Sequence, residues 1–180
     1  MSKVIVSSML SLDGVVEAPE RWAFQFWDDE ISAWSMDELL DGDTLLLGRT
    51  TYEGFVAYWP SATEPPDIAA RMNSMPKLVA STTLAAVTWN ATLLRDDVAA
   101  QIAQLKRGPG GDILLLASAD LTQTLIHHDL VDEYRLRVAP IVVGSGARLF
   151  RGAEAPTNLD LVVAKHFASG FVALTYRVRR

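Results

Sequence analysis

The stretch Thr44-Leu45-Leu46-Leu47-Gly48-Arg49-Thr50-Thr51-Tyr52-Glu53 joins a run of apolar residues to an abrupt Gly-Arg turn. Apolar side chains return at helical spacing after the turn, so the stretch predicts a buried strand, a tight turn and the start of a helix. The first N–H groups of a helix lack backbone partners and carry partial positive charge, which suits an anion. Gly48 lets the backbone approach a ligand closely, Arg49 adds a cation that can bind a phosphate, and Thr50 adds a hydroxyl. The turn therefore predicts an anion-binding site, although an ordinary strand-to-helix connection with a surface arginine explains the same residues.

Strand-like apolar runs alternate with helical patterns on both sides of this turn. Strands are predicted at residues 4–10, 44–48, 77–81, 92–94, 112–117 and 133–143, and helices at 28–41, 49–59, 67–72, 96–106 and 118–126. The last part of the chain, 159–167 and 171–178 around Ser169-Gly170, predicts a terminal β-hairpin. This order is typical of an α/β fold, with a mostly parallel central sheet, helices on both faces and a C-terminal antiparallel β-hairpin.

Composition limits both the organisation of the chain and the classes of function. The 180 residues are most simply one domain, 1–180. The absence of cysteine excludes disulfides, cysteine-ligated metals and thiol catalysis, and no His/carboxylate spacing predicts a metal site. A net charge of −6 argues against nucleic-acid binding. No apolar run approaches the length of a membrane span and no targeting segment is evident, so we expect a cytoplasmic protein.

Polar turns follow several of the predicted strands. Besides Gly48-Arg49-Thr50, these are Ser81-Thr82-Thr83 and Ala117-Ser118-Ala119. Ligands of open α/β sheets bind outside the carboxyl ends of the strands. The sequence therefore predicts a ligand site where these turns meet.

Several segments resemble, in the same order, those of the dihydrofolate-reductase-like superfamily. They are Ser11-Leu12-Asp13-Gly14, Gly48-Arg49-Thr50-Thr51-Tyr52-Glu53, Lys77-Leu78-Val79-Ala80-Ser81-Thr82-Thr83-Leu84, Gly110-Gly111-Asp112-Ile113, Leu130-Val131-Asp132-Glu133 and Pro140-Ile141-Val142-Val143-Gly144-Ser145-Gly146. More narrowly, the chain resembles the bacterial family related to the C-terminal reductase domain of the riboflavin-biosynthesis deaminase/reductase. The resemblance covers nearly the whole chain.

The resemblance implies a dihydrofolate-reductase-like fold that binds NADPH and transfers a hydride to a small, heterocyclic substrate. It places Gly48, Arg49 and Thr50 at the adenosine phosphates, Ser81 and Thr82 near the 2′-phosphate or its ribose, and Ala117, Ser118 and Ala119 at the pyrophosphate. It also favours a loop over the cofactor for Gly144-Ser145-Gly146, with a plain turn as the alternative. An arginine and hydroxyls at a strand end favour NADPH over NADH.

The chain departs from the family pattern in two places. The family usually has a glycine where this chain has Ala117, and a methyl group there is expected to push the backbone away from the diphosphate. The riboflavin-pathway reductases carry an Asp-Asp-Pro stretch where this chain has Glu53-Gly54-Phe55, and a glutamate where it has Leu116. The identity of the substrate is therefore not transferred.

Two further groups of residues are candidates for contact with the reacting molecules. Asp13 follows the first strand and is the candidate catalytic group, a polar side chain near the nicotinamide, with an Asp-Gly turn as the alternative. The proton of the reduction could come from Asp13 or from a water. Trp22 and Trp27, with Phe24 and Phe26, could form an aromatic wall for a flat substrate, pack in the core or cover a dimer interface.

These observations support three hypotheses. The leading one is an NADPH-dependent reductase of a small molecule. The second is a module of the same fold that binds a nucleotide or a drug-like ligand without turnover, for which the departure at Ala117 is the reason. The third is a chiefly structural homodimer, and a homodimer is also the expected state of the reductase.

Overall fold

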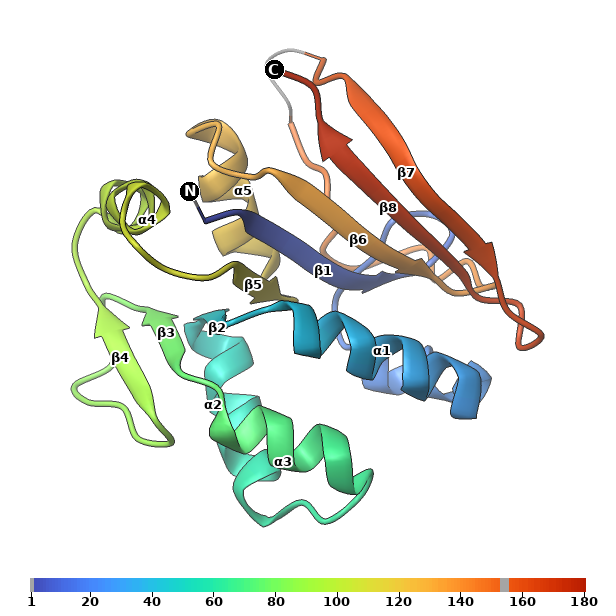
Figure 1. Cartoon of the computed structure of the whole chain (residues 1–180). Coiled ribbons are helices and arrows are strands. Elements are labelled where there is room, and N and C mark those ends of the chain that lie inside the picture. Colours follow the sequence, from blue (N-terminus) through green and yellow to red (C-terminus); the bar gives the residue numbers. More distant parts are fainter. Residues whose placement is uncertain (1, 153–155) are drawn as a thin grey trace.

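The chain folds around one eight-stranded sheet with the strand order β4-β3-β2-β5-β1-β6-β8-β7 (Figure 1). The computed structural model describes residues 2–152 and 156–180. The strands are β1 (Val4–Leu10), β2 (Thr44–Gly48), β3 (Lys77–Ala80), β4 (Ala91–Leu94), β5 (Ile113–Leu116), β6 (Glu133–Val138), β7 (Leu159–His166) and β8 (Val172–Val178). The helices are α1 (Asp29–Asp41), α2 (Arg49–Tyr58), α3 (Pro66–Ser74), α4 (Val98–Arg107) and α5 (Ala119–His127), with short 3-10 turns η1 (Pro19–Arg21), η2 (Phe24–Phe26) and η3 (Trp59–Ser61).

The sheet is parallel from β4 to β6 and antiparallel at its other end. β1 lies between β5 and β6 and pairs in parallel with both, whereas β8 runs antiparallel to β6 and to β7. The predicted fold class and the C-terminal hairpin are thus confirmed. The strand predicted over 133–143 is too long, since β6 ends at Val138. The N–H of Ala139 still donates to the carbonyl of Leu10, but Pro140 has no N–H with which to continue the ladder.

Helices cover both faces of the parallel part of the sheet, which explains its continuous apolar strands. Ile102 of α4 and Leu121 of α5 pack on one face, in a cluster with Leu115 of β5. Leu39 of α1 and Met72 of α3 pack on the other face. Figure 1 shows α4 and α5 on one side of the sheet and α1, α2 and α3 on the other. A strand buried on both sides cannot alternate with polar residues, so its sequence reads as an unbroken apolar run.

No helix within the described ranges has the length and the apolar composition that a membrane span requires.

Candidate functional site

The connections of β1 and β5 create a topological switch point between these two neighbouring strands. The chain leaves β1 through α1 and reaches β2 beyond β5, and it leaves β5 through α5 and reaches β6 beyond β1. Pairing between β1 and β5 ends at Ser7 and Leu116, whereas β1 stays paired with β6 as far as Leu10. The carboxyl ends of the two strands therefore separate here. Open α/β sheets bind their ligands at this kind of position.

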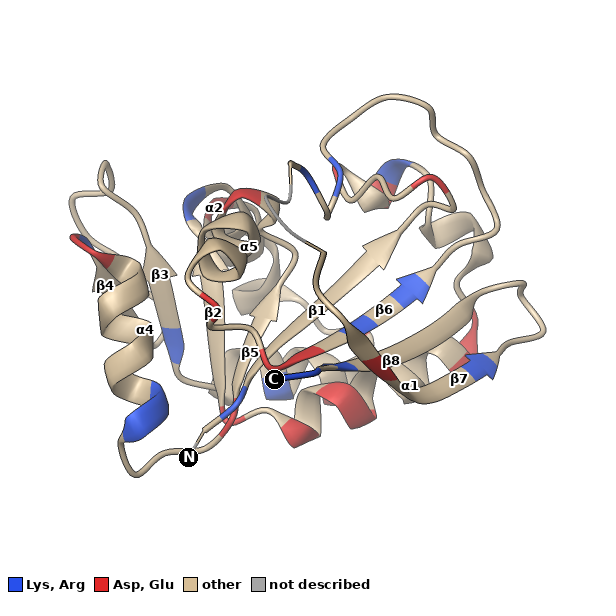
Figure 2. Ribbon diagram, turned by 90° about the horizontal axis from the view of Figure 1, so that it is seen from above, with Lys and Arg blue, Asp and Glu red and all other residues tan. Residues whose placement is uncertain are grey.

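A single hydroxyl joins the two turns that begin α2 and α5, residues 48–51 and 117–119, which we call the paired turns. The N–H of Gly48 donates to Ser118 Oγ at 2.9 Å. The hydroxyl of Ser118 lies 2.9 Å from Thr51 Oγ1 and 3.0 Å from the carbonyl oxygen of Leu116, and can donate its hydrogen to either. Viewed from above, α2 and α5 begin beside each other at the carboxyl ends of the strands (Figure 2). The structure thus brings two of the three predicted turns together.

The backbone of the second turn is in a conformation that suits glycine. Ala117 has φ 51° and Ser118 has φ 56°, both in the left-handed region. This region costs an ordinary L-residue about 1–2 kcal/mol because Cβ approaches the following carbonyl oxygen, and glycine avoids that cost. The N–H of Ala117 donates to the carbonyl of Ser7 at 3.3 Å, which helps hold the turn. The backbone conformation thus suits the glycine that the family resemblance leads one to expect here, and Ala117 adopts it with strain.

Arg49 lies at the first position of α2 with its guanidinium at the surface. Its Nη1 forms an ion pair with Glu53 at 3.1 Å, and about half of each side chain is exposed. Exposed pairs one helical turn apart contribute little free energy in water, so an incoming anion can compete for the guanidinium. Thr50 is exposed beside it. Arg49 and Thr50 are thus accessible to a ligand.

The third predicted turn lies beside the first, because β3 is the neighbour of β2 and Ala80 pairs with Gly48. Ser81 is buried, and its hydroxyl accepts the N–H groups of Thr83 at 3.2 Å and Leu84 at 3.1 Å. Its hydroxyl therefore stabilises the local turn. Thr82 lies within this turn and is exposed.

The carboxylate of Asp13 binds the loop that follows β6. Its Oδ1 accepts the hydroxyl of Ser11 at 2.7 Å and the N–H of Val143 at 3.0 Å, and its Oδ2 accepts the N–H of Gly144 at 2.9 Å. The hydrogen bond from Ser11, followed by that from Val143, lowers the pKa of Asp13 to about 2. The carboxylate is ionised at neutral pH, and its contacts favour a structural role in positioning Gly144. A role for Asp13 beside the nicotinamide stays a prediction.

The predicted aromatic residues lie over the C-terminal hairpin, away from the paired turns. Trp22 is 7% exposed and belongs to a cluster with Phe171, and its indole N–H donates to the carbonyl of Glu17 at 2.9 Å. Trp27 packs edge-on against Phe171 with ring centroids 6.4 Å apart, and its indole N–H donates to Ser32. These contacts favour core packing for both tryptophans, and a contact with substrate stays a prediction.

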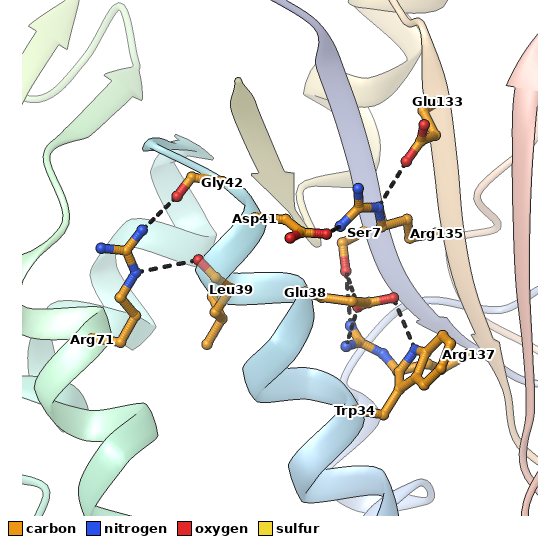
Figure 3. A network of polar contacts seen from close by, with 10 residues as sticks. All are labelled: Ser7, Trp34, Glu38, Leu39, Asp41, Gly42, Arg71, Glu133, Arg135 and Arg137. Atoms are coloured by element: carbon orange, nitrogen blue, oxygen red, sulfur yellow. Dashed lines mark hydrogen bonds and ion pairs between the residues drawn. The ribbon is translucent and has the colours of Figure 1, made fainter. Parts of the chain in front are cut away.

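A buried polar network lies under α1 and was not predicted from the sequence (Figure 3). Arg137 of β6 forms an ion pair with Glu38 of α1 at 2.7 Å, and it donates to Ser35 and Ser7. Glu38 also accepts the indole N–H of Trp34. Glu38 and Arg137 are 99 residues apart in the sequence, and charged residues are usually exposed, so no local pattern indicates that this pair is buried. The network ties α1 to β1 and β6, the two strands beside the switch point.

A signal for part of this network exists in the sequence. Glu133, Arg135 and Arg137 alternate at period two, so all three lie on one face of β6. That face is covered by α1, where Arg135 pairs with Glu133 at 2.8 Å and with Asp41 at 3.0 Å. Charges on a covered face must be paired, which predicts acidic partners on the helix.

Two surface hollows lie away from the paired turns. One, of about 370 Å³, is near the beginning of β6 and the end of β8 and includes Tyr134 and Arg180 in its lining. The other, of about 200 Å³, lies between α4 and the residues after α5. Within the ranges that the structure describes, no group of three or more His, Asp or Glu side chains could hold a metal ion. The chemistry of the paired turns, with N–H donors and one cation, is that of an anion site.

Comparison with solved structures identifies the fold. A putative riboflavin biosynthesis protein from Shewanella sp. PV-4 matches with a TM-score of 0.74 and 22% identity, over 99% of each chain. A pyrimidine reductase-like protein from Corynebacterium diphtheriae matches with a TM-score of 0.70 and 13% identity, over 99% of this chain and 92% of that one. RibD from Acinetobacter baumannii matches with a TM-score of 0.71 and 14% identity, and the match spans 99% of this chain but 58% of that chain.

Sequence comparison identifies the family. The protein YyaP of Bacillus subtilis, described as uncharacterized, is 31% identical over 97% of this chain and 94% of its own length. The uncharacterized protein YwjB of the same organism is 26% identical over 92% of each chain. Residues 2–173 match the family described as the RibD C-terminal domain. The chain therefore belongs to the RibD C-terminal domain family, with the dihydrofolate-reductase-like fold that its sequence predicts.

Proposed function

We propose that the protein is an NADPH-dependent reductase of a small heterocyclic molecule, and that the paired turns hold the phosphates of the cofactor. The observation that carries this proposal is the bridge through Ser118, which joins the starts of α2 and α5 beside the switch point. The first N–H groups of both helices have no acceptor within their own helix, and both helix dipoles direct positive charge to this place. Family membership supports the same reaction class.

The residues present fit an anionic dinucleotide. Arg49 offers a cation, and Thr50 and Thr82 offer exposed hydroxyls. The carboxylates near the two helix starts are already paired, Glu53 with Arg49 and Asp120 with Arg151. An arginine in this position would bind the 2′-phosphate that distinguishes NADPH from NADH.

NADPH, when bound, supplies the hydride and carries the redox chemistry. The protein then has to orient the two reactants and exclude water, which requires no catalytic dyad. We assign orientation to the paired turns and to the loop around Gly144, which Asp13 holds through two backbone N–H groups. Because the pKa of Asp13 is about 2, the carboxyl group carries no proton to donate at neutral pH. Water is the simpler proton donor in this proposal.

Fluorescence titration with NADPH and NADH tests the proposal directly. We expect the nicotinamide emission to change on binding, with NADPH bound at least 10-fold more tightly than NADH, since a phosphate–arginine contact contributes about 1.5–3 kcal/mol. No binding of either cofactor at millimolar concentration would exclude the reductase.

A ligand-binding module without turnover is the second candidate, and the strained Ala117 is the observation that favours it. Incubation of the protein and NADPH with a panel of flat heterocycles separates the two candidates. Loss of NADPH absorbance with any one substrate supports the reductase, whereas tight binding without oxidation across the panel supports the module.

A further inference from the structure

Ser7 of β1 is where the pairing of β5 with its neighbouring strands ends. The ladder between β1 and β5 ends with Ser7 opposite Leu116. The ladder between β2 and β5 ends one residue earlier, at Leu115. The N–H of Ala117 then donates to the carbonyl oxygen of Ser7 at 3.3 Å. The backbone of Ser7 is therefore the support from which the second of the paired turns leaves the sheet.

The side chain of Ser7 is fixed on the side of the sheet that α1 covers. Its hydroxyl lies 3.1 Å from Glu38 Oε2 and 3.0 Å from Arg137 Nη2, so it can donate to the carboxylate and accept from the guanidinium. All three residues are more than nine-tenths buried. Figure 3 shows Glu38 and Arg137 converging on Ser7 from α1 and from β6. A buried hydroxyl that has both a donor and an acceptor is held in one orientation.

The helix that supplies Glu38 is itself held at both ends. Asp28 caps its start by accepting the N–H of Ile31 at 2.9 Å. Arg71 of α3 donates to the carbonyl oxygen of Gly42, the residue that follows the helix, at 2.6 Å (Figure 3). The position of the Glu38 carboxylate is therefore set by the packing of α1 as a whole.

Stability alone does not explain a charged pair at this place. Arg137 Nη1 and Glu38 Oε2 are 2.7 Å apart, and the transfer of two charges from water costs free energy that their attraction offsets only in good geometry. Nε of Arg137 is buried without a hydrogen-bond partner in the described ranges, which adds to the cost. Apolar side chains of similar size are often as stable in such positions. Hydrogen bonds, unlike apolar contacts, fix the direction of the groups that they join. The pair therefore adds orientation, and the group that it orients is Ser7.

We propose that Glu38 and Arg137 are positioning residues for the second of the paired turns. They hold Ser7, and the carbonyl of Ser7 holds the N–H of Ala117, whose backbone is in the strained left-handed conformation. A strained turn relaxes when its support loosens, and the first N–H groups of α5 then lose their alignment with those of α2. This inference rests on the proposed function, because these N–H groups are the ones assigned to the phosphates of NADPH. In this proposal α1 affects cofactor binding through β1.

Replacement of the network by apolar side chains separates orientation from stability. The triple variant Ser7→Ala/Glu38→Leu/Arg137→Met removes the charges and the hydroxyl together, so no buried charge is left unpaired. The hydroxyl of Ser35 can turn to a carbonyl of its own helix. We expect the urea midpoint to equal or exceed that of the wild type, whereas NADPH affinity in the fluorescence titration falls about 10-fold. NADH affinity should fall by a similar factor, because both cofactors contain the pyrophosphate.

Hydrogen exchange of the free protein gives a readout that needs no cofactor. Measured by NMR, the amide hydrogen of Ala117 should exchange about 10-fold faster in the triple variant, because its acceptor is no longer held. The amide hydrogen of Val79 in β3 should exchange as in the wild type. A role of the network in stability alone would not change the exchange of Ala117 selectively.

Leu39→Ala is the matched control, because Leu39 follows Glu38 in α1 and is 7% exposed against 6%. It packs in the apolar cluster with Met72, so it should lower the urea midpoint and leave NADPH affinity unchanged. Glu38→Gln guards against a triple variant that does not fold. It keeps the size of the side chain but removes the charge that faces Arg137, and it should weaken NADPH binding where Leu39→Ala does not.

Unchanged NADPH affinity in the folded triple variant would overturn the proposal, even if Ala117 exchanged faster. An equal loss of affinity in Leu39→Ala would overturn it as well, since loss of stability would then explain the effect. A wild type that binds neither NADPH nor NADH would instead contradict the proposed function. In that case unchanged exchange of Ala117 in the triple variant would show that the network does not hold the turn either.

Discussion

The paired turns make the same kind of strand-to-helix connection with different backbone conformations. Each joins the carboxyl end of a buried parallel strand to the first residue of a helix, and Ser118 links them. Gly48 has φ −77° and ψ 163°, an extended conformation that any residue adopts. Ala117 has φ 51°, in the left-handed region that favours glycine. The glycine thus stands where the backbone does not need it, and an alanine stands where a glycine would be free of strain.

This difference separates two reasons for placing a small residue in a turn. At Gly48, a Cβ atom would lie 3.5 Å from Cβ and Oγ of Ser118, an ordinary contact. The turn itself therefore does not require a glycine, and under the proposed function Gly48 lets the cofactor approach the backbone closely. At Ala117 the surrounding hydrogen bonds enforce the left-handed conformation on a residue that disfavours it. The backbone of the first turn is therefore unstrained, whereas the second turn depends on its hydrogen bonds to keep a strained conformation.

The largest expected effect is a loss of NADPH affinity in Arg49→Ala, which tests whether the first turn binds a ligand. Arg49→Ala should weaken NADPH binding roughly 10- to 100-fold and NADH binding less than about 3-fold, because only NADPH offers the 2′-phosphate. Fluorescence titration measures both affinities. Arg107→Ala, at the exposed end of α4, is the control and should change neither. Equal losses for the two cofactors would remove the assignment of Arg49 to the 2′-phosphate.

Breaking the bridge should affect both turns together. Ser118→Ala leaves the N–H of Gly48 without its acceptor, and we expect the free energy of unfolding to fall by about 1–3 kcal/mol. Urea denaturation measures this change. Ser118→Gly loses the same hydrogen bonds but relieves the left-handed strain, so it should be less destabilising than Ser118→Ala. Unchanged stability in Ser118→Ala would show that the bridge contributes nothing to the paired turns.

Removing the left-handed strain at Ala117 should leave the second turn, like the first, with an unstrained backbone. Ala117→Gly removes a left-handed strain of about 1–2 kcal/mol but adds backbone entropy to the unfolded chain, so we expect a net gain of about 0.5–1 kcal/mol. Thermal and urea unfolding give the gain. A simultaneous increase in NADPH affinity would show that the methyl group also obstructs the pyrophosphate, and a loss of stability would contradict the strain argument.

The smallest expected effect on stability belongs to the residue that looks most constrained in the sequence. Gly48→Ala should change the free energy of unfolding by less than about 0.5 kcal/mol, since the new methyl group meets Ser118 at an ordinary distance. Its NADPH affinity should nevertheless fall, because the methyl group keeps the phosphate away from the backbone. An unfolding free energy reduced by more than about 2 kcal/mol would mean that Gly48 is a structural glycine after all.

Local patterns in the sequence determined the elements of the fold and the positions of the turns. The apolar run of β5 between Gly111 and Ala117, and the helical spacing after Arg49, depend only on residues close in the chain. Such periodicities follow from the geometry of strand and helix, so they can be read without knowing the partners. Family resemblance then indicated which turns to assign to the candidate site.

Only the tertiary structure decided which polar groups meet. It placed Ser118 against Gly48, 70 residues away, and Arg137 against Glu38, 99 residues away. It turned Asp13 toward the backbone of Val143 and Gly144. It also left Leu161 of β7 largely exposed while it buried Ala173 of β8. Pairings of this kind depend on the order and register of strands that are distant in the chain, and a local pattern of residues contains no information about that order.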